Sequence, residues 1–166
     1  MQGLIQTQPL LLTDILRHAM RRTPDKEIVT RLVEGGIHRY TYAACGQRIA
    51  QLAHALRDLD IGEGDRVGVI GWNTHRQLEL YYALAGIGAI CHTINPRLGP
   101  ENAGYVINHA GDKALFYDNT FAPLAVGLAP HLKSVEHFVE MCPEEEISDN
   151  ALDAVSYEAL QKDKPT

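Results

Sequence analysis

Long apolar runs are missing from this sequence, and so is the N-terminal pattern of a secreted protein. No stretch approaches the roughly 18 consecutive apolar residues that mark a membrane-spanning helix. The first residues, MQGLIQTQPLLLTDIL, include a short apolar run but neither the basic start nor the small-residue cleavage site of a signal peptide. We therefore expect no transmembrane segment and a cytoplasmic location.

Cysteine is scarce, and its spacing suggests no pairing. The three cysteines, Cys45, Cys91 and Cys142, are odd in number and far apart, and no CxxC pair occurs. The eight histidines are spread singly along the chain, without the HExxH spacing that places two ligands on one helix face. These absences argue against a disulfide framework and favour a reducing compartment. No metal-binding residue is predicted.

Clustered positive charge and the common catalytic motifs are also absent. The 15 lysines and arginines are scattered and the net charge is -6, which argues against nucleic acid as a partner. Gly68 and Gly71, in GVIGWN, fit neither GxGxxG nor GxxxxGKS/T, so they are interpreted as turn glycines. No GxSxG elbow occurs, and Cys91 and His92 would face opposite sides of a strand. No catalytic residue is predicted.

Short apolar runs alternate with helical patterns from residue 66 onward. This alternation is typical of an α/β fold with a parallel sheet and helices on both faces. Thr74 and Gln77 fit a capping box that begins one crossover helix, and Pro100 suits the first position of the next, which Gly111 ends. The predicted strands are Arg66 to Ile70, Ala89 to Ile94, Lys113 to Tyr117 and Val135 to Val139.

The N-terminal part of the chain shows a different pattern. A helix is predicted to start near Thr13, and the segments Glu27 to Arg31 and Ile37 to Tyr40 form a β-hairpin around two glycines. Thr41 then caps a long helix whose apolar residues recur every three or four positions. The expected fold is therefore α/β, with the parallel sheet preceded by a small helix and β-hairpin.

The chain divides into three predicted parts within one partial domain, residues 1–166. Residues 1–40 form the N-terminal helix and hairpin, 41–141 the α/β sheet region, and 142–166 an acidic linker with a short helix. Glu144, Glu145 and Glu146 are interpreted as a solvated charge run in that linker.

The segment ICHTINPRLG, residues 90–99, is placed where the predicted sheet would bind a ligand. Ligands of open α/β sheets collect beyond the carboxyl ends of the strands. Pro96 biases Asn95 away from helical dihedral angles, so the turn would direct Arg97 outward. Spacing alone favours a structural turn with a solvated arginine, and His92 is interpreted as a hydrogen-bonded core residue. Arg97 is nevertheless the best functional candidate.

Residues 66–98, RVGVIGWNTHRQLELYYALAGIGAICHTINPRL, resemble the N-terminal region of adenylate-forming acyl-CoA ligases, especially bacterial medium- and long-chain fatty acid CoA synthetases. The resemblance extends upstream through YTYAACGQRIAQLAHALRDLDIGEGD and downstream through INHAGDKALFYD and LKSVEHFV. It covers the chain from about Thr13 to Met141, and HTINPRL is its most specific part.

The resemblance implies a two-step reaction on a fatty acid. The carboxylate attacks the α-phosphate of ATP, which Mg²⁺ accompanies, and releases pyrophosphate; the thiol of coenzyme A then displaces AMP from the acyl-adenylate. In some relatives an arginine near this region approaches the nucleotide phosphates of coenzyme A. The resemblance assigns that role to Arg97, because a guanidinium suits a phosphate in charge and geometry.

The sequence departs from the ligase pattern by what it does not contain. The Ser/Thr/Gly-rich loop ending in Pro-Lys-Gly is absent, and so are the later segments that hold adenine, ribose and magnesium and the domain with the catalytic lysine. The chain is therefore predicted to be the N-terminal piece of a fatty acid CoA ligase that is inactive alone.

Two other functions fit the sequence less well. A non-catalytic interaction or dimerisation module could keep this fold, and some long-chain relatives form homodimers through their N-terminal segment. A flavodoxin-like nucleotide-binding protein is disfavoured, because neither strand-to-helix turn has the usual phosphate-binding composition. An apolar exposed surface would separate a subdomain from an independent module.

Overall fold

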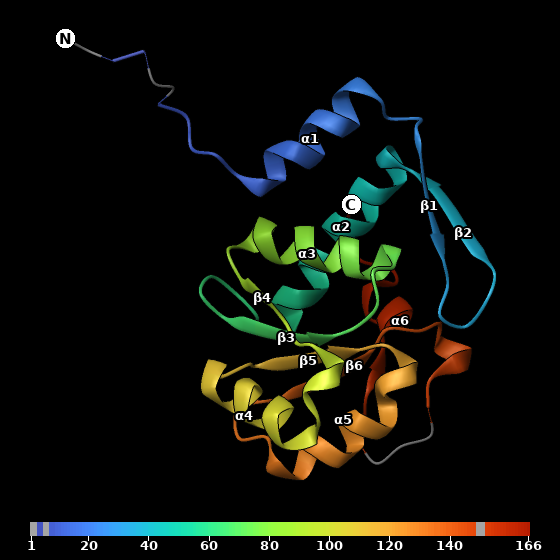
Figure 1. Ribbon diagram of the computed structural model, residues 1–166. Helices are drawn as coiled ribbons and strands as arrows, with labels where there is room; N and C mark the ends of the chain where they lie inside the picture. The colour runs from blue at the N-terminus through green and yellow to red at the C-terminus, as the bar shows by residue number, and fades with distance from the viewer. Residues whose placement is uncertain (1–2, 5–6, 149–151) are drawn as a thin grey trace.

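The computed structural model describes residues 3–4, 7–148 and 152–166, and a five-stranded parallel sheet lies at its centre (Figure 1). The strands run in the spatial order β4-β3-β5-β6-β7. Gly68 of the third strand is in register with His92 on one side and Leu115 on the other. The bounds are β3 (Arg66–Ile70), β4 (Ile90–Thr93), β5 (Ala114–Tyr117), β6 (His137–Glu140) and β7 (Val155–Ser156).

Two helical layers cover the two faces of the sheet (Figure 1). The helices are α1 (Leu12–Arg22), α2 (Tyr42–Asp58), α3 (His75–Ile87), α4 (Pro100–Ala110), α5 (Ala122–Leu128) and α6 (Tyr157–Gln161). Successive side chains of β5 point to opposite faces of the sheet and so contribute to different layers. Phe116 packs with residues of α2 and α3, and Leu115 packs with residues of α4 and α5. Helix α1 packs outside, against α2 and α3. The predicted fold class is confirmed.

Capping residues mark the start or the end of several helices. Thr41 accepts a hydrogen bond from the Ala44 amide at 3.2 Å at the start of α2, and Gly111 ends α4 in the left-handed conformation with φ 68°. The capping box predicted for Thr74 and Gln77 does not form: Thr74 is the N-cap of α3, but its hydroxyl makes no capping bond. Its Oγ1 is buried and unpartnered within the described part of the chain.

A two-stranded hairpin precedes α2 and lies beside α3 (Figure 1). It consists of β1 (Glu27–Arg31) and β2 (Ile37–Thr41), which pair antiparallel with Val29 opposite Arg39. The predicted hairpin is therefore present. Short 3-10 turns join the larger elements at Pro96–Leu98, Asn119–Phe121, Ala129–His131 and Glu144–Glu146.

Two details of the sheet differ from the sequence prediction. Gly68 lies inside β3 instead of in a turn. Strand β6 begins and ends later than predicted, and its last residue is the buried Glu140. The charged Glu140 can be buried at the end of this strand because Ser148 donates two hydrogen bonds to its carboxylate, at 2.7 and 3.2 Å.

The C-terminal part returns to the body of the molecule. Residues 144–146 form an exposed turn, whereas β7 pairs with β6, and Tyr157 of α6 is fully buried among residues of the core. The division of the chain at residues 40 and 141 remains a prediction. Across the described residues, no helix combines the length and apolar character that crossing a bilayer requires.

Candidate functional site

Three loops meet at the carboxyl edge of the sheet. They follow β3, β4 and β5 at residues 71–74, 94–99 and 118–121, and the three strands are parallel neighbours. The loop after β3 leads to α3 on one face, while the loops after β4 and β5 lead to α4 and α5 on the other. Such a change of direction creates the crevice in which open α/β sheets bind ligands.

The loop after β4 holds Arg97 in a defined turn. Asn95 adopts an extended conformation, and its Oδ1 accepts a hydrogen bond from the Arg97 amide at 2.9 Å. Pro96 starts the short 3-10 turn, while Ile94 is buried beneath it. The Arg97 side chain is exposed. The predicted turn is thus present, and its geometry leaves the guanidinium accessible from solvent.

The loops after β3 and β5 are joined through a buried carboxylate. Asp118 is fully buried, and its Oδ2 accepts a hydrogen bond from the Trp72 amide at 2.5 Å. The indole of Trp72 donates to Thr120 Oγ1 at 3.0 Å and lies 5.3 Å from the ring of Phe121. Trp72 is therefore held from both ends, although its side chain remains about half exposed.

The close packing around this carboxylate depends on Gly71. A Cβ at that position would lie 2.6 Å from Met141 Cε and 3.2 Å from both Asp118 Oδ2 and Gln77 Oε1. Burial raises the pKa of Asp118 to about 6, although the Trp72 amide and the Arg76 guanidinium act in the opposite direction. The carboxyl edge therefore contains an acidic group that titrates close to neutral pH.

His92 and Asp112 form a pair away from this edge. The Nδ1 of His92 lies 2.7 Å from Oδ2 of the fully buried Asp112, and a Cβ on Gly68 would come equally close to that oxygen. The absence of a side chain at Gly68 therefore leaves the space that the Asp112 carboxylate occupies beside β3. The predicted hydrogen bond of His92 is present, but its side chain is 27% exposed, not buried.

Cys91 is not placed to act as a nucleophile. It packs against the α2–α3 side of the sheet, and burial raises the pKa of its thiol to about 11. A thiol with a raised pKa carries little of the reactive thiolate at neutral pH. Among the residues that the structure describes, no group of three or more histidine, cysteine, aspartate or glutamate side chains is arranged to hold a metal ion.

A buried ion network lies between the hairpin, α2, α3 and α6, and sequence analysis missed it. Arg76 is 3% exposed and donates to both carboxylate oxygens of Glu34, at 2.7 and 3.2 Å, and to Glu158 at 2.9 Å. Arg48 donates to both oxygens of the buried Glu79 and also to Glu158. Glu158 therefore joins the two arginines.

Electrostatics favour the ionised form of two carboxylates in this network, Glu158 and Glu34. Burial alone would raise the pKa of Glu158, but hydrogen bonding to His75 and the charges and hydrogen bonds of Arg48 and Arg76 bring it well below its ordinary value. The pKa of Glu34 is likewise lowered, with Arg76 overcoming the effect of burial. In the sequence, this network is indicated only by a charged residue at a core-facing helix position, such as Glu79 beside Leu80. That pattern does not identify the residue with which the charge pairs.

Comparisons with known proteins identify the family of the chain and agree with its fold. Residues 16–165 match the family described as AMP-binding enzyme, and the chain belongs to that family. It is 42% identical over 146 residues to a 3-methylmercaptopropionyl-CoA ligase of Ruegeria lacuscaerulensis, covering 88% of this chain and 27% of the relative. It is 46% identical over 134 residues to a long-chain-fatty-acid–CoA ligase of Thermus thermophilus, covering 81% and 25%.

Solved structures share the fold over nearly the whole chain. An anthranilate CoA ligase in complex with anthranoyl-AMP superposes with a TM-score of 0.82 at 20% identity, over 95% of this chain and 29% of that one. A fatty acyl CoA synthetase of Mycobacterium tuberculosis gives 0.73 at 20% identity, over 91% and 28%. The chain thus spans about a quarter of the length of the curated relatives it matches.

Replacing Asp118 with Asn is expected to remove one pH-dependent loss of stability. Because the pKa of Asp118 in the folded protein is about 6 and its ordinary value is 3.8, its ionisation lowers the free energy of unfolding as pH rises between these values. The stability of Asp118→Asn relative to wild type should therefore increase by about 2–3 kcal/mol from about pH 4 to about pH 7.5. Urea unfolding of both proteins measures this change.

The exposed Asp25 supplies the matched control. Asp25→Asn should leave the difference from wild type nearly constant over the same pH range. If Asp118→Asn behaves in the same way as this control, the pKa of Asp118 is not raised in the folded protein.

Proposed function

We propose that this chain is the N-terminal part of an ATP-dependent fatty acid CoA ligase that acts in the cytoplasm. The observation that carries the proposal is the match over residues 16–165 to the AMP-binding family, together with relatives named as acyl-CoA ligases. The three loops at the carboxyl edge of the sheet support it, because ligand sites of open α/β sheets form beyond that edge.

The proposed reaction proceeds in two displacements. A carboxylate oxygen of the fatty acid attacks the α-phosphorus of ATP, and the bond to pyrophosphate breaks, which leaves an acyl-adenylate. The sulfur of coenzyme A then attacks the acyl carbon, and AMP departs as the thioester forms. Activation as a mixed anhydride is needed because a carboxylate is a poor acceptor for a thiol.

This chain supplies only part of the machinery for that reaction. The described segments contain no group of three or more side chains arranged to hold a metal ion, and we assign no residue of this chain to the Mg²⁺ that would accompany ATP. The chain spans about a quarter of its relatives' length, and no residue in it is assigned a catalytic role. We propose that ATP and Mg²⁺ are held by later residues of a longer protein.

Arg97 is the residue that we assign to coenzyme A. Its guanidinium is exposed at the carboxyl edge, and its backbone is fixed by the bond from its amide to Asn95. An arginine fork presents several donors to a phosphate and keeps its charge at any physiological pH. The role proposed is binding of a nucleotide phosphate, with no part in bond making.

A dimer through the N-terminal region is the further assembly that we propose. Leu11, Leu12 and Ile15 are 45–60% exposed along α1 and the residue before it, although each is a large apolar side chain. Exposed apolar patches on helices commonly mark protein contacts. The same surface would serve the alternative function, a non-catalytic interaction or dimerisation module of this fold.

The purified chain should not catalyse the first reaction step. We expect no exchange of labelled pyrophosphate into ATP in the presence of octanoate or palmitate, because this sequence contains no Ser/Thr/Gly-rich loop ending in Pro-Lys-Gly. A complete ligase serves as the positive control in the same assay. Exchange that depends on fatty acid would show that the 166 residues hold a whole adenylation site.

Arg97→Ala in the longer ligase should weaken binding of coenzyme A. Loss of a charged hydrogen bond to phosphate predicts a rise in KM for coenzyme A of about 10- to 100-fold. The KM values for ATP and fatty acid should change little, and Arg97→Lys should restore part of the affinity. Arg57→Ala, which removes an exposed arginine of α2, is the control. An unchanged KM in Arg97→Ala would remove the assignment.

Multi-angle light scattering tests the dimer directly. The wild-type chain should show about twice 18.4 kDa, and Ile15→Asp should shift it towards the monomer mass because a charge would be buried in the contact. Tyr105→Asp places the same charge at an exposed position on α4 and should leave the mass unchanged. A wild-type monomer at high concentration would contradict the proposal.

A further inference from the structure

Two histidine rings are stacked where the hairpin packs on α3. The ring of His38, on β2, lies 4.1 Å from the ring of His75, the first residue of α3, and the two planes are inclined by 23°. The ring of Tyr40 lies 4.8 Å from that of His38 and 5.9 Å from that of His75. His75 is 2% exposed. These three rings form the contact between the hairpin and the start of α3.

The surroundings of the stacked pair suit neutral imidazole rings better than cationic ones. A protonated ring carries two N–H donors, and each requires an acceptor. His38 Nε2 and His75 Nδ1 are buried and have no hydrogen-bond partner among the described residues, so a cationic ring at either position would bury an unsatisfied donor. Two cationic rings at this separation would also repel each other with little water to screen them.

Charged and titratable side chains surround the pair on every side. They are Glu34 and Tyr40 of the hairpin, Arg48 of α2, Arg76 and Glu79 of α3, and Glu158 of α6. Asp118, in the loop after β5, also interacts with His75. Glu158 lies 3.8 Å from His75 Nε2 and can balance a positive charge on that ring. A second positive charge, on His38, would face both His75 and Arg48.

The direction of the pKa shift at His38 agrees with this geometry. Burial lowers the pKa of His38 below its ordinary value of 6.5, and the charges of His75 and Arg48 act in the same direction. Glu79 and Glu158 oppose the shift without overcoming it. A histidine with a lowered pKa contributes stability that is fully present above its ordinary pKa and is lost as the pH falls below that value.

We propose that the stacked pair His38–His75 makes the docking of the hairpin on α3 sensitive to acid. The hairpin is docked when His38 is neutral. In mildly acidic solution the released hairpin takes up a proton on His38 that the docked hairpin excludes, so the balance moves towards release. The Arg76–Glu34 pair opposes release, and the change is therefore a local opening and not unfolding of the sheet. The proposal needs neither ATP nor coenzyme A.

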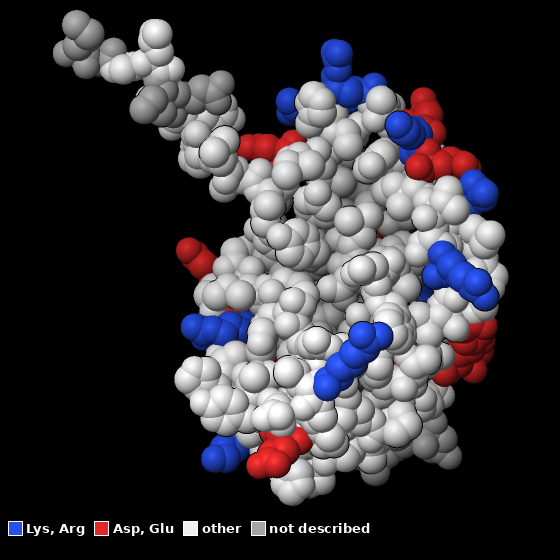
Figure 2. All heavy atoms as spheres, viewed as in Figure 1, with Lys and Arg blue, Asp and Glu red and all other residues white. Residues whose placement is uncertain are grey.

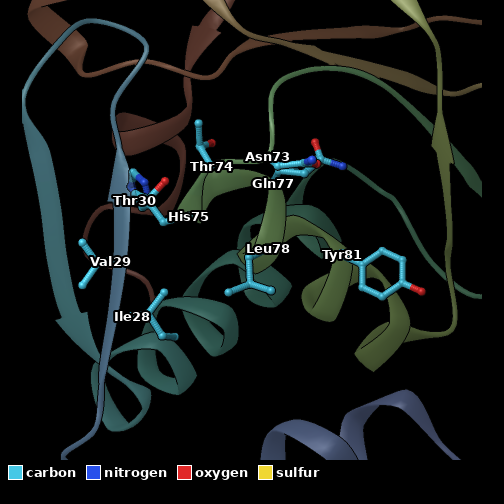
Figure 3. Close-up of a pocket in the computed structure, with 9 residues that line it drawn as sticks. All are labelled: Ile28, Val29, Thr30, Asn73, Thr74, His75, Gln77, Leu78 and Tyr81. Carbon is cyan, nitrogen blue, oxygen red and sulfur yellow. The ribbon is translucent and has the colours of Figure 1, made fainter.

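Release of the hairpin would uncover apolar surface on α3. A cleft already lies between β1 and α3, and Figure 3 shows Ile28 and Leu78 facing each other across it. In Figure 2 the hollowed surface between the hairpin and α3 carries few charged side chains. Because β1 belongs to the hairpin, its release would widen this cleft and expose Leu78 to solvent.

The thiol of Cys45 reports the position of the hairpin. Cys45 is fully buried on α2, and the Tyr40 hydroxyl of β2 donates a hydrogen bond to its Sγ at 3.3 Å. The experiment labels the purified chain with a pyridyl disulfide, which reacts with thiols in acidic as well as neutral solution. Peptide mass spectrometry assigns the label to Cys45, and each rate is divided by that of free cysteine at the same pH.

The relative labelling rate at Cys45 should rise as the solution becomes acidic. A rise of about tenfold is expected from about pH 7.5 to about pH 5.5, because release of the hairpin binds one additional proton. Circular dichroism should show that the helices remain intact throughout this range.

Matched variants separate the histidine pair from other effects of acid. His38→Phe keeps a ring in the stack that cannot be protonated, so its relative rate at Cys45 should stay constant with pH. His54→Phe makes the same change at an exposed histidine of α2 and should keep the full rise of the wild type. If His38→Phe fails to fold, His38→Gln supplies a second side chain without a charge.

Three results would overturn the proposal. The first is a wild-type rate at Cys45 that does not rise in acid, which is decisive whether or not the variants fold. The second is an equal rise in the wild type and in the uncharged variant of His38, and the third is loss of the helical circular dichroism signal by the wild type. Pyrophosphate exchange enters none of these measurements, so failure of the ligase proposal and failure of this one can be told apart.

Discussion

Two arginines, one buried and one partly buried, constrain how the hairpin, α2, α3 and α6 are arranged on one side of the sheet. Arg76 is buried and Arg48 is partly buried, and among the described residues their carboxylate partners are Glu34, Glu79 and Glu158. These partners come from the hairpin, α3 and α6, so each element must be in place for the charges to be neutralised. Removal of one partner of a buried ion pair commonly costs about 3–5 kcal/mol, because the other charge is left uncompensated.

The network also reaches the carboxyl edge of the sheet. Besides its carboxylate partners, Arg76 donates to the Met141 carbonyl at 3.1 Å, and the side chain of Met141 lies against Gly71 in the loop that carries Trp72. At the same time the Arg76–Glu34 pair ties α3 to the hairpin, whose strand β1 faces α3 across a cleft lined by Ile28 and Leu78. The carboxyl edge and the cleft are thus positioned by one set of charges.

Local sequence patterns predicted most helices and strands, but they could not predict contacts between residues that are far apart in the chain. Arg66–Ile70 was predicted residue by residue, and the turn at Asn95 formed as its Asn-Pro pair indicated, because both depend on near neighbours. Strand β7 and helix α5 were not predicted, since two residues or seven give little periodicity. The cleft and the ion network could not be foreseen, because their groups are brought together only by the tertiary fold.

The position of Glu158 in the chain has a consequence for biosynthesis. It pairs with Arg48 and Arg76, which lie 110 and 82 residues earlier in the chain. The other pairs are closer in sequence: 42 residues separate Arg76 from Glu34, and 31 residues separate Arg48 from Glu79. During translation the hairpin, α2 and α3 can therefore form the pairs Arg76–Glu34 and Arg48–Glu79 before α6 has been synthesised. The emergence of α6 then supplies the last carboxylate, so completion of this layer is a late event in folding.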